Sequence, residues 1–483
     1  MRCAGKSLLL VLWLGSQVAY GQIPYPNPIR HVVVIVQENR TPDNLFHGLL
    51  TWPGINPANY DISSKGVNSR GEVIPLEPIP LGISYDLSHA HAAFVAMYNS
   101  GKMNGADKVP CSGNCVSNPQ FKYVDNSQHT VDPYLTLAAD YGWANYMFQT
   151  NQGPSYPAHQ FIFGGTSARS ESEDHAGIYV AENPVAPKGS NYLAQNDTGC
   201  LAPLNEWNYL LYPDGAEKKL TNNPLGTLCF SHATMGSSLE ARGLTWKYYA
   251  PTVANPNHSN PGGLFWIAPN SIREICEPNG SYTECLGRSW ANSVDLNPAD
   301  VLTDIGSCQL DNVSWVIPPG QNSDHPGSPA ATGGPSWVAS IVNAIGNDTK
   351  CEGGAGYWSD TAIIVTWDDW GGWYDHVAPR ILYGALGSYQ FGFRVPLLVV
   401  SAYTPRAYVD NIHHDFGSIQ RFIEGAFGIP ERSLGLADAR ASGDLGGFFK
   451  FQQSPREFRS IKAPLDADFF IHDTRPPEPP DTD

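Results

Sequence analysis

The sequence predicts an α/β fold built on a mainly parallel β-sheet, and three observations support this prediction. Runs of valine and isoleucine without polar alternation recur along the chain, which is typical of strands buried on both faces of a parallel sheet. Segments with helical spacing of apolar residues lie between these runs, so strands and helices alternate. A hydrophobic content of 42% with 11% aromatic residues excludes a disordered chain.

Four segments are expected to form strands of this sheet. Residues 31–37 (HVVVIVQ) and 361–367 (TAIIVTW) carry the clearest runs, and residues 395–401 (VPLLVVS) repeat the pattern. Residues 313–317 show a weaker version of it. Because none of them alternates polar with apolar residues, we expect both faces of each strand to be buried.

Four further segments are expected to form helices. Residues 89–100, 157–163 and 336–345 have apolar residues at helical spacing. Residues 415–427 follow the same pattern and begin with Asp415, a residue type that often caps helices. The helices fall between or after the expected strands, as a parallel sheet with crossover connections requires.

Residues 1–21 are typical of a secretory signal peptide. A basic segment with Arg2 and Lys6 precedes an apolar run at 8–14 (LLLVLWL), and small residues follow at 19–21. Seven apolar residues are too few for a membrane-spanning helix, which needs about 20, and no later segment comes closer. We therefore expect an exported protein, secreted or periplasmic, without a transmembrane segment.

The charge of the chain excludes one class of partner. Removal of Arg2 and Lys6 with the signal would leave 27 of the 29 Lys and Arg residues against 46 Asp and Glu, a net charge of −19. Nucleic-acid binding needs clustered basic residues, so we expect no nucleic-acid partner. The residues give no indication of the oligomeric state.

Eight cysteines remain once Cys3 is removed with the signal, and an even number in an exported protein predicts disulfides. Zinc binding is the weaker alternative, because no second Cys/His pair follows Cys111 and Cys115 at a finger-like distance. Eight cysteines allow 105 connectivities, and pairing between sequence neighbours is only the simplest assumption. The eight are Cys111, Cys115, Cys200, Cys229, Cys276, Cys285, Cys308 and Cys351.

Composition also divides the mature chain. The length of residues 22–473 would fit one elaborated domain or two domains, and we expect a single catalytic domain. Within them, residues of about 165–300 are rich in Asn, Pro and Gly and hold four of the eight cysteines, so we expect a loop-rich insertion or cap joined by disulfides. Residues 474–483 (TRPPEPPDTD) are expected to be a disordered tail.

Polar residues follow two of the expected strands directly. Glu38 and Asn39 come after the first strand, and Asp368 and Asp369 after the strand at 361–367. Open α/β sheets place their ligands at the carboxyl ends of strands, and oxygen donors of this kind bind divalent cations. The alternative is structural, with Asn39 capping a helix and the two aspartates forming a turn.

Ser155 is a candidate nucleophile in the segment Gly-Pro-Ser-Tyr-Pro. The prolines place it at a tight turn before a helix, with its hydroxyl facing outward at a helix N-terminus that favours an anion. An ordinary serine N-cap is the alternative. His89 and His325 are the leading histidine candidates, because each lies in a polar loop beside a carboxylate that can hold its tautomer. His376, His413 and His414 are the remaining histidine candidates, but an exposed histidine is more often inert than catalytic.

Together these segments resemble the phosphoesterase family that contains bacterial phospholipases C, plant non-specific phospholipases C and an acid phosphatase. The blocks occur in the family's order and span most of the mature chain. They are ENRTPDNLFHG at 38–48, DLSHAHAAFVAMYNSGKMNG at 86–105, QGPSYPAHQFIFGG at 152–165, NSDHPG at 322–327, WDDWGGWYDHVAP at 367–379, GFRVPLLVVS at 392–401 and HDFGSIQRFIEGAFGIP at 414–430.

The resemblance implies an alkaline-phosphatase-like, three-layer α/β/α sandwich and assigns roles by position. Ser155 matches the nucleophile, which also contacts the metal, and His89 and His325 lie in the blocks that supply histidines around the phosphate. The metal ligands are implied at Glu38, Asn39, Asp368 and Asp369. Asp369 departs from the family, where glutamate is common. The metal's identity stays open among Ca²⁺, Mn²⁺, Fe and Mg²⁺.

The function implied is that of an exported, metal-dependent phosphoesterase that forms a phosphoserine intermediate. Broad, acid-phosphatase-like activity is favoured over a phospholipase C that releases diacylglycerol, because Ser155 stands where phospholipase members tend to have threonine. The substrate expected is a phosphate ester or a phospholipid.

Two rival functions are less consistent with the residues. A carbohydrate-binding or adhesion protein would suit 13 Trp and 23 Tyr, but such modules are usually all-β. A sulfatase-like hydrolase would carry the motif C/S-x-P-x-R, whereas His159 stands here at the arginine position.

Overall fold

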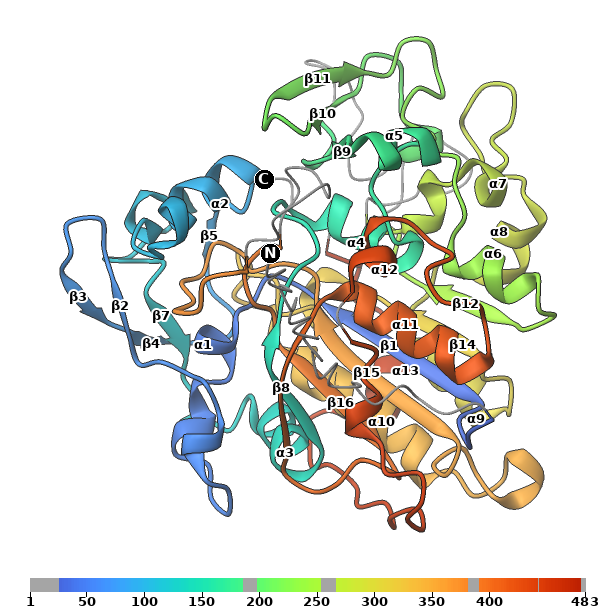
Figure 1. The fold of residues 1–483 in the computed structure, drawn as a ribbon. Coiled ribbons are helices and arrows are strands. Elements are labelled where there is room, and N and C mark those ends of the chain that lie inside the picture. Colours follow the sequence, from blue (N-terminus) through green and yellow to red (C-terminus); the bar gives the residue numbers. More distant parts are fainter. Residues whose placement is uncertain (1–25, 186–197, 253–265, 381–390, 442, 479–483) are drawn as a thin grey trace, which may run out of the picture.

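The computed structural model describes residues 26–478 except 186–197, 253–265, 381–390 and 442 (Figure 1). The expected signal peptide therefore lies outside the described residues. An eight-stranded sheet forms the middle layer of the molecule. Its strands in spatial order are β13 (Val294–Asp295), β12 (Trp246–Tyr249), β14 (Val313–Val316), β1 (His31–Gln37), β15 (Thr361–Trp367), β16 (Leu397–Ser401), β8 (Gly142–Met147) and β17 (Tyr408–His414).

Strands β1 and β15 form the centre of the sheet and confirm the prediction made for them. They pair in parallel over seven positions, from His31 opposite Thr361 to Gln37 opposite Trp367. All residues of both strands are buried, which explains why their sequences are apolar without alternation. Because the two strands end level with each other, the residues that follow them emerge side by side.

The sheet is mainly parallel but contains one reversed strand. β16 runs antiparallel to both of its neighbours, β15 and β8. Its five residues are buried like those of β1. An apolar run in the sequence therefore indicates a strand that is buried on both faces, but it does not indicate whether the strand is parallel or antiparallel to its neighbours. Strands β8, β12, β13 and β17 were not expected from the sequence, and β12 and β13 lie inside the stretch of 165–300.

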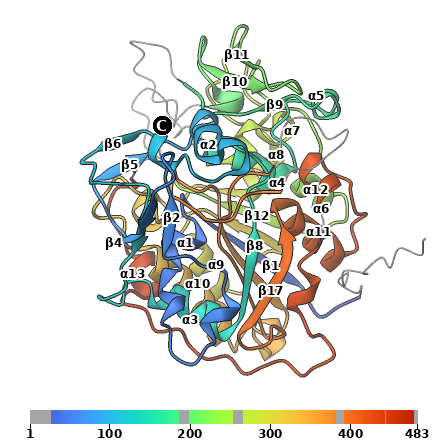
Figure 2. The same cartoon turned by 60° about the vertical axis from the view of Figure 1, so that its left-hand side comes forward.

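Helices cover both faces of the sheet and complete three layers (Figures 1 and 2). On one side, α10 packs against α3, α9 and α13; on the other, α11 packs against α4 and α12. The long helices α10 and α11 agree with the predicted segments, and Asp415 forms a capping box with Ser418 at the start of α11. The helices are α3 (Asp132–Asp140), α9 (Asp300–Gly306), α10 (Gly334–Asn347), α13 (Ala467–Ile471), α4 (Ser155–Gly164), α6 (Met235–Glu240), α11 (Phe416–Phe427) and α12 (Leu436–Arg440).

Residues 42–124 form a smaller lobe, which is seen at the left of Figure 1. It has its own apolar cluster, which also includes Trp370, Trp373 and Phe393 from segments next to the sheet. These residues join the lobe to the loop that follows β15. Its elements are α1 (Pro42–Leu45), β2 (Lys65–Val67), β3 (Val73–Pro75), β4 (Glu77–Ile79), β5 (Tyr85–Leu87), α2 (His91–Tyr98), β6 (Cys111–Gly113) and β7 (Lys122–Val124).

The stretch of 165–300 is loop-rich and disulfide-bonded, and it also supplies β12 and β13 to the central sheet. A three-stranded sheet within it lies at the top of Figure 1. Its remaining elements are α5 (Glu171–Ala176), β9 (Tyr179–Val180), β10 (Trp207–Leu211), β11 (Glu217–Thr221), α7 (Arg273–Cys276) and α8 (Arg288–Ser293). All eight cysteines in the described part of the chain form disulfides, each with the next cysteine in the sequence: Cys111–Cys115, Cys200–Cys229, Cys276–Cys285 and Cys308–Cys351.

The end of the chain differs in part from the expected disordered tail. Residues 474–478 lie against the loop that begins after β14: the Glu478 N–H donates to Gln321 Oε1 at 2.8 Å, and the Gly320 N–H donates to the Glu478 carbonyl at 3.4 Å. Residues 479–483 lie outside the described residues. Within the described ranges, no helix has the length and apolar character needed to cross a bilayer.

Candidate active site

Five segments converge at the carboxyl ends of β1 and β15. Glu38 and Asn39 follow β1, Asp368 and Asp369 follow β15, and the start of α4 faces them. The loop after β14 and the turn before α2 complete the group. Among the sequence-predicted residues, the side chains brought together here are Glu38, Asn39, His89, Ser155, His325, Asp368 and Asp369, all of which are buried.

Ser155 is the first residue of α4, and its side chain points to the carboxylates. Its Oγ lies 3.2 Å from Glu38 Oε2 and 3.3 Å from Asp369 Oδ2, in hydrogen-bonding contact with both. Pro154 occupies the N-cap, and no side chain caps the helix there. The outward orientation expected from the sequence is therefore wrong, and so is the alternative of an ordinary serine N-cap.

The two aspartates use one oxygen each to shape the backbone. Asp368 Oδ1 accepts the N–H of Asn39 at 3.1 Å and that of Asp369 at 2.7 Å. Asp369 Oδ1 accepts the N–H of Gly371 at 2.7 Å. Asp368 Oδ2 is fully buried and has no hydrogen-bond partner. The turn considered as an alternative thus exists, and it leaves the second oxygen of Asp368 facing the site.

Asn39 orients two histidines and keeps its own oxygen unpaired. Its Nδ2 donates to His325 Nε2 at 3.1 Å and to His89 Nε2 at 3.4 Å. The Nδ1 atoms of the rings face the carbonyls of Pro326 at 2.6 Å and Leu87 at 3.0 Å, so we place the proton of each neutral ring on Nδ1. Asn39 Oδ1 is buried without a hydrogen-bond partner. Asn39 does not cap a helix, since Thr41 caps α1.

The carboxylate beside His325 does not hold that ring, contrary to the expectation from the sequence. Asp324 Oδ2 instead accepts from Tyr134 Oη at 2.7 Å and Trp367 Nε1 at 3.1 Å, and its Oδ1 has no hydrogen-bond partner. Burial raises the pKa of Asp324 to about 6. The Arg40 guanidinium donates to the Asp324 carbonyl at 2.7 and 2.9 Å. Asp324 thus anchors the loop, while a backbone carbonyl sets the tautomer of His325.

The electrostatics of the site fit a bound cation. Burial raises the pKa of Glu38 well above its usual range, and the charges of Asp368 and Asp369 raise it further. Three buried carboxylates at this spacing repel one another unless a proton or a cation neutralises them. Asn39 Oδ1 and Asp368 Oδ2 are buried without hydrogen-bond partners, and carboxylate and amide oxygens are suitable ligands for a divalent metal.

His159 belongs to this cluster and was not predicted as a site residue. It lies one helical turn after Ser155 on α4, fully buried, with Nε2 3.1 Å from Glu38 Oε1 and 3.9 Å from Asp368 Oδ2. Burial lowers the pKa of His159 to about 4, so the ring is neutral near pH 7. Its i+4 spacing from Ser155, which places both residues on one helix face, is the signal that could have revealed it.

His376 lies apart from this cluster, in a separate ion-pair group. Its Nδ1 is 2.8 Å from Asp43 Oδ2, and its Nε2 is 3.1 Å from Asp61 Oδ1. Arg394 binds Asp375 through two hydrogen bonds of 2.8 and 2.9 Å and lies beside Asp43. Each of the three carboxylates already has a cationic partner in Arg394 or His376, which fits a structural role.

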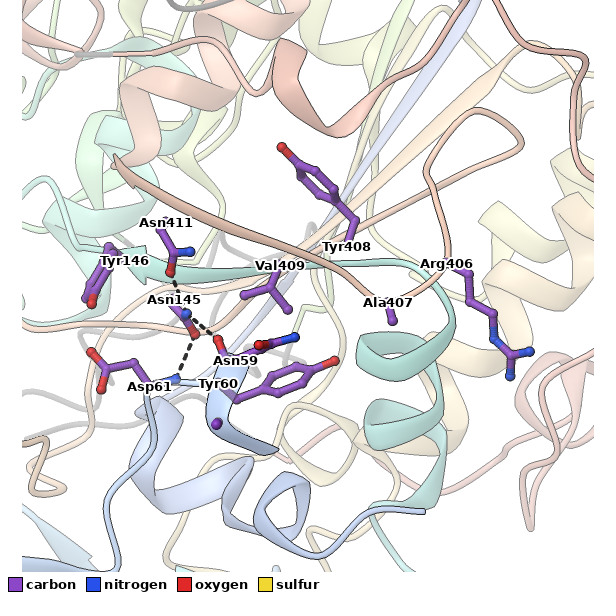
Figure 3. Close-up of a pocket in the computed structure, with 11 residues that line it drawn as sticks. Asn59, Tyr60, Asp61, Asn145, Tyr146, Arg406, Ala407, Tyr408, Val409 and Asn411 are labelled. Carbon is purple, nitrogen blue, oxygen red and sulfur yellow. Dashed lines mark hydrogen bonds between the residues drawn. The ribbon is translucent and has the colours of Figure 1, made fainter. Parts of the chain in front are cut away.

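A hollow of about 680 Å³ lies elsewhere, at the β8–β17 edge of the sheet (Figure 3). Asn145 joins its walls through hydrogen bonds to Asn411, to the Asn59 carbonyl and to the Asp61 N–H. Its lining contains none of the residues of the carboxylate cluster. This hollow is therefore separate from the candidate chemistry.

Comparison with known proteins shows the family of the chain. Phospholipase C A of Mycobacterium tuberculosis is 25% identical over 496 residues, covering 96% of this chain and 86% of its own. Non-hemolytic phospholipase C of Pseudomonas aeruginosa is 26% identical over 258 residues, covering 47% of this chain and 34% of its own. A Vibrio parahaemolyticus protein of the alkaline phosphatase superfamily aligns in structure with a TM-score of 0.34 and 11% identity, covering 85% of this chain and 69% of that one. A model of the Phosphoesterase family matches residues 29–430, so the chain belongs to this family and is a phosphoric ester hydrolase.

Proposed function

We propose that this protein is a metal-dependent phosphoesterase in which Ser155 attacks phosphorus and forms a phosphoserine intermediate. The observation that carries the proposal is the position of Ser155 Oγ, 3.2 Å from Glu38 and 3.3 Å from Asp369 at the edge of a buried carboxylate cluster. A serine hydroxyl needs a neighbouring base or a cation to become a nucleophile. The carboxylates of this cluster can act as the base, and their arrangement fits a bound cation.

A divalent cation held by Glu38, Asn39, Asp368 and Asp369 would neutralise a non-bridging phosphate oxygen and lower the pKa of the serine hydroxyl. Ser155 contacts the same cluster and transfers its proton to the carboxylate of Glu38 or Asp369. As the bond from Oγ to phosphorus forms, the ester bond to the leaving oxygen breaks.

A histidine acts as the general acid that protonates the leaving oxygen. His325 is the first choice and His89 the second, because both turn Nε2 toward Asn39 while a backbone carbonyl holds Nδ1. Nε2 takes up a proton from solvent, which displaces its hydrogen bond from Asn39, and gives this proton to the leaving oxygen. The same atom then removes a proton from the water that attacks the phosphoserine. As the bond from phosphorus to Oγ breaks, the carboxylate that took the serine proton returns it to Oγ.

For the substrate, we propose broad activity on soluble phosphate esters. The support is Ser155, where phospholipase members tend to have threonine, and a formal net charge of −17 that disfavours anionic bilayers. Phospholipase C activity is the second candidate, because a protein named phospholipase C aligns with 96% of the chain.

We also propose that the protein is exported. The support is the signal-like sequence at 1–21 together with four disulfides, which form and persist in oxidising compartments.

A substrate panel with and without chelator tests the proposed function. Purified protein is assayed on an aryl phosphate and on phosphatidylcholine vesicles, with Ser155→Ala as the blank. We expect the aryl phosphate to be hydrolysed at least as fast as the lipid, with both activities lost in chelator and restored by a divalent ion. Release of diacylglycerol without aryl phosphate hydrolysis would reverse the substrate ranking. Activity that is unaffected by complete metal removal would contradict the mechanism.

A further inference from the structure

The hydrogen bonds around His159 determine which ring nitrogen carries its proton. Tyr248 Oη donates its only proton to the carbonyl of Trp266 at 2.8 Å. The same hydroxyl lies 3.3 Å from His159 Nδ1, and its oxygen is therefore available there only as an acceptor. Nδ1 must be the donor in this contact. In the neutral ring the proton is consequently on Nδ1, and Nε2 carries a lone pair.

That lone pair faces acceptor atoms. Nε2 lies 3.1 Å from Glu38 Oε1 and 3.9 Å from Asp368 Oδ2, and all three side chains are fully buried. Without a proton or a cation between them, three acceptors this close together and away from water repel one another. A cation between them converts the repulsion into coordination, and Asp368 Oδ2 is already without any hydrogen-bond partner.

From this geometry we infer that His159 is a nitrogen ligand of the metal centre, bound through Nε2 beside Glu38 and Asp368. The inference deepens the proposed function and rests on its metal centre. One atom from each of the three side chains lies within 4.8 Å of the others. Ligand atoms bonded at about 2.0–2.2 Å to one ion lie at most about 4.4 Å apart, so small side-chain shifts complete the set.

A nitrogen ligand changes which ion the site prefers. Ca²⁺ and Mg²⁺ take oxygen ligands almost exclusively, whereas imidazole suits Zn²⁺, Cu²⁺, Fe²⁺ and Ni²⁺. With His159 in the ligand set, the centre has mixed nitrogen and oxygen donors. We therefore expect a first-row transition ion in preference to Ca²⁺ or Mg²⁺, a choice that the oxygen ligands alone leave open.

The competing arrangement is a protonated His159 that donates from Nε2 to Glu38 without touching the metal. Both arrangements place His159 next to Glu38, and both predict that its loss lowers activity. They differ in whether an imidazole nitrogen is bonded to the ion, which spectroscopy reports independently of turnover.

Pulsed electron paramagnetic resonance of the Mn²⁺-loaded protein provides the test. We expect coupling to a directly bound ¹⁴N nucleus in the wild type and in the matched controls His325→Gln and His89→Gln, and loss of that coupling in His159→Gln. Bound Mn²⁺ without nitrogen coupling in the wild type, or coupling that survives in His159→Gln, would overturn the inference and leave the proposed function standing.

Two further measurements test the ligand role of His159 independently of the Mn²⁺ spectra. X-ray absorption of the Zn²⁺-loaded wild type, which needs no variant, should show imidazole scattering, and its absence would refute the ligand role even if His159→Gln fails to fold. Titrations should show that His159→Gln weakens Zn²⁺ binding at least about tenfold and Ca²⁺ binding far less. A wild type that binds none of these ions would overturn both the inference and the metal centre of the proposed function.

Discussion

At the scale of single residues, Asn39 shows how backbone geometry creates the site. Its φ of 59° lies in the left-handed region, which residues other than glycine adopt infrequently. Gly371 packs against it so closely that a Cβ there would lie 2.4 Å from the Asn39 carbonyl oxygen. This strained turn directs Nδ2 to two histidines and leaves Oδ1 for the proposed cation, which fits the tendency of strained backbone to occur at functional sites.

Replacement of Ser155 by alanine tests the nucleophile. We expect turnover to fall at least about a thousandfold, because the attacking oxygen is removed while the proposed ligands stay in place. Ser155 does not cap α4, so the free energy of unfolding should change by no more than about 2 kcal/mol from the lost hydrogen bonds. Steady-state kinetics and urea unfolding measure the two effects. Retention of more than a tenth of the wild-type rate would contradict the role.

Replacement of Asp368 by asparagine tests the metal ligands. The variant keeps an oxygen for the N–H groups of Asn39 and Asp369 but loses the charge beside the unpaired Oδ2. Metal content by elemental analysis and activity should fall together, and Glu38→Gln should behave alike. Unchanged metal in both variants would leave these residues with a structural role only.

Asp375→Asn is the matched control for that experiment. Asp375 is as deeply buried as Asp368, but it pairs with Arg394 and lies outside the carboxylate cluster. Breaking this pair should cost about 3–5 kcal/mol of unfolding free energy, while the folded fraction keeps its metal. Thermal unfolding and elemental analysis separate the two effects.

At the scale of elements, the sequence predicted the centre of the sheet well. β1 and β15 match the predicted bounds, because burial on both faces allows only apolar residues and leaves an unmistakable run. Their parallel pairing was enough to bring Glu38 and Asp368 together. β8 was missed because its sequence contains Asn145, whose side chain makes four hydrogen bonds, to Trp143, Asn411, the Asn59 carbonyl and the Asp61 N–H. Sequence alone does not show such tertiary compensation.

The candidate site was predicted in composition but not in its interactions. The residues expected as oxygen ligands, Ser155 and both histidines all meet in one buried cluster. His159 was missed because helical spacing identifies a shared face without saying what that face contacts. The role expected for Asp324 was wrong for a related reason: adjacency in the chain does not determine where a carboxylate points, and this one turns to Tyr134 and Trp367.

The loop after β15 gives the protein a pH-dependent stability. Burial lowers the pKa of His376, but the hydrogen bond and charge of Asp43, with Asp375, outweigh it and raise the pKa to about 9. Asp61 and Arg394 also face the ring. Because the folded pKa exceeds the unfolded value of 6.5, the stabilisation is complete below pH 6.5 and disappears as the pH rises through about 9.

Urea unfolding between pH 6 and 10 measures this effect. The wild type should lose about 3 kcal/mol across the range, and His376→Gln should lose much less because the titrating ring is absent. Parallel curves for the two proteins would show that His376 does not control this part of the profile.

At the scale of the whole molecule, the disulfides hold together loops that the sheet does not. Cys308–Cys351 joins positions 43 apart in sequence, whereas Cys111–Cys115 joins positions 4 apart. Chain entropy predicts a contribution of about 4 kcal/mol for the longer loop and about 2 kcal/mol for the shorter one. Paired Cys→Ser variants should therefore show a larger loss of stability for Cys308–Cys351.

Alkylation of unreduced protein should modify no thiol in either region, and several modified cysteines would contradict the pairing.

The overall architecture explains why a strongly acidic protein can process an anionic ester. The chain carries a formal net charge of −17, yet the proposed chemistry takes place at a buried cluster whose own negative charge would attract a cation. A bound cation reverses the local field that the substrate meets. The central sheet, the small lobe and the stretch of 165–300 each supply part of the surroundings of that cluster.

Acid quenching of the reaction, followed by mass spectrometry of the peptide that contains Ser155, tests the central claim most directly. During turnover of an aryl phosphate with metal present, the account predicts phosphate on Ser155, with none after chelation or in Ser155→Ala. Rapid turnover with no phosphate on Ser155 at any quench time, or phosphate on a different residue, would contradict it.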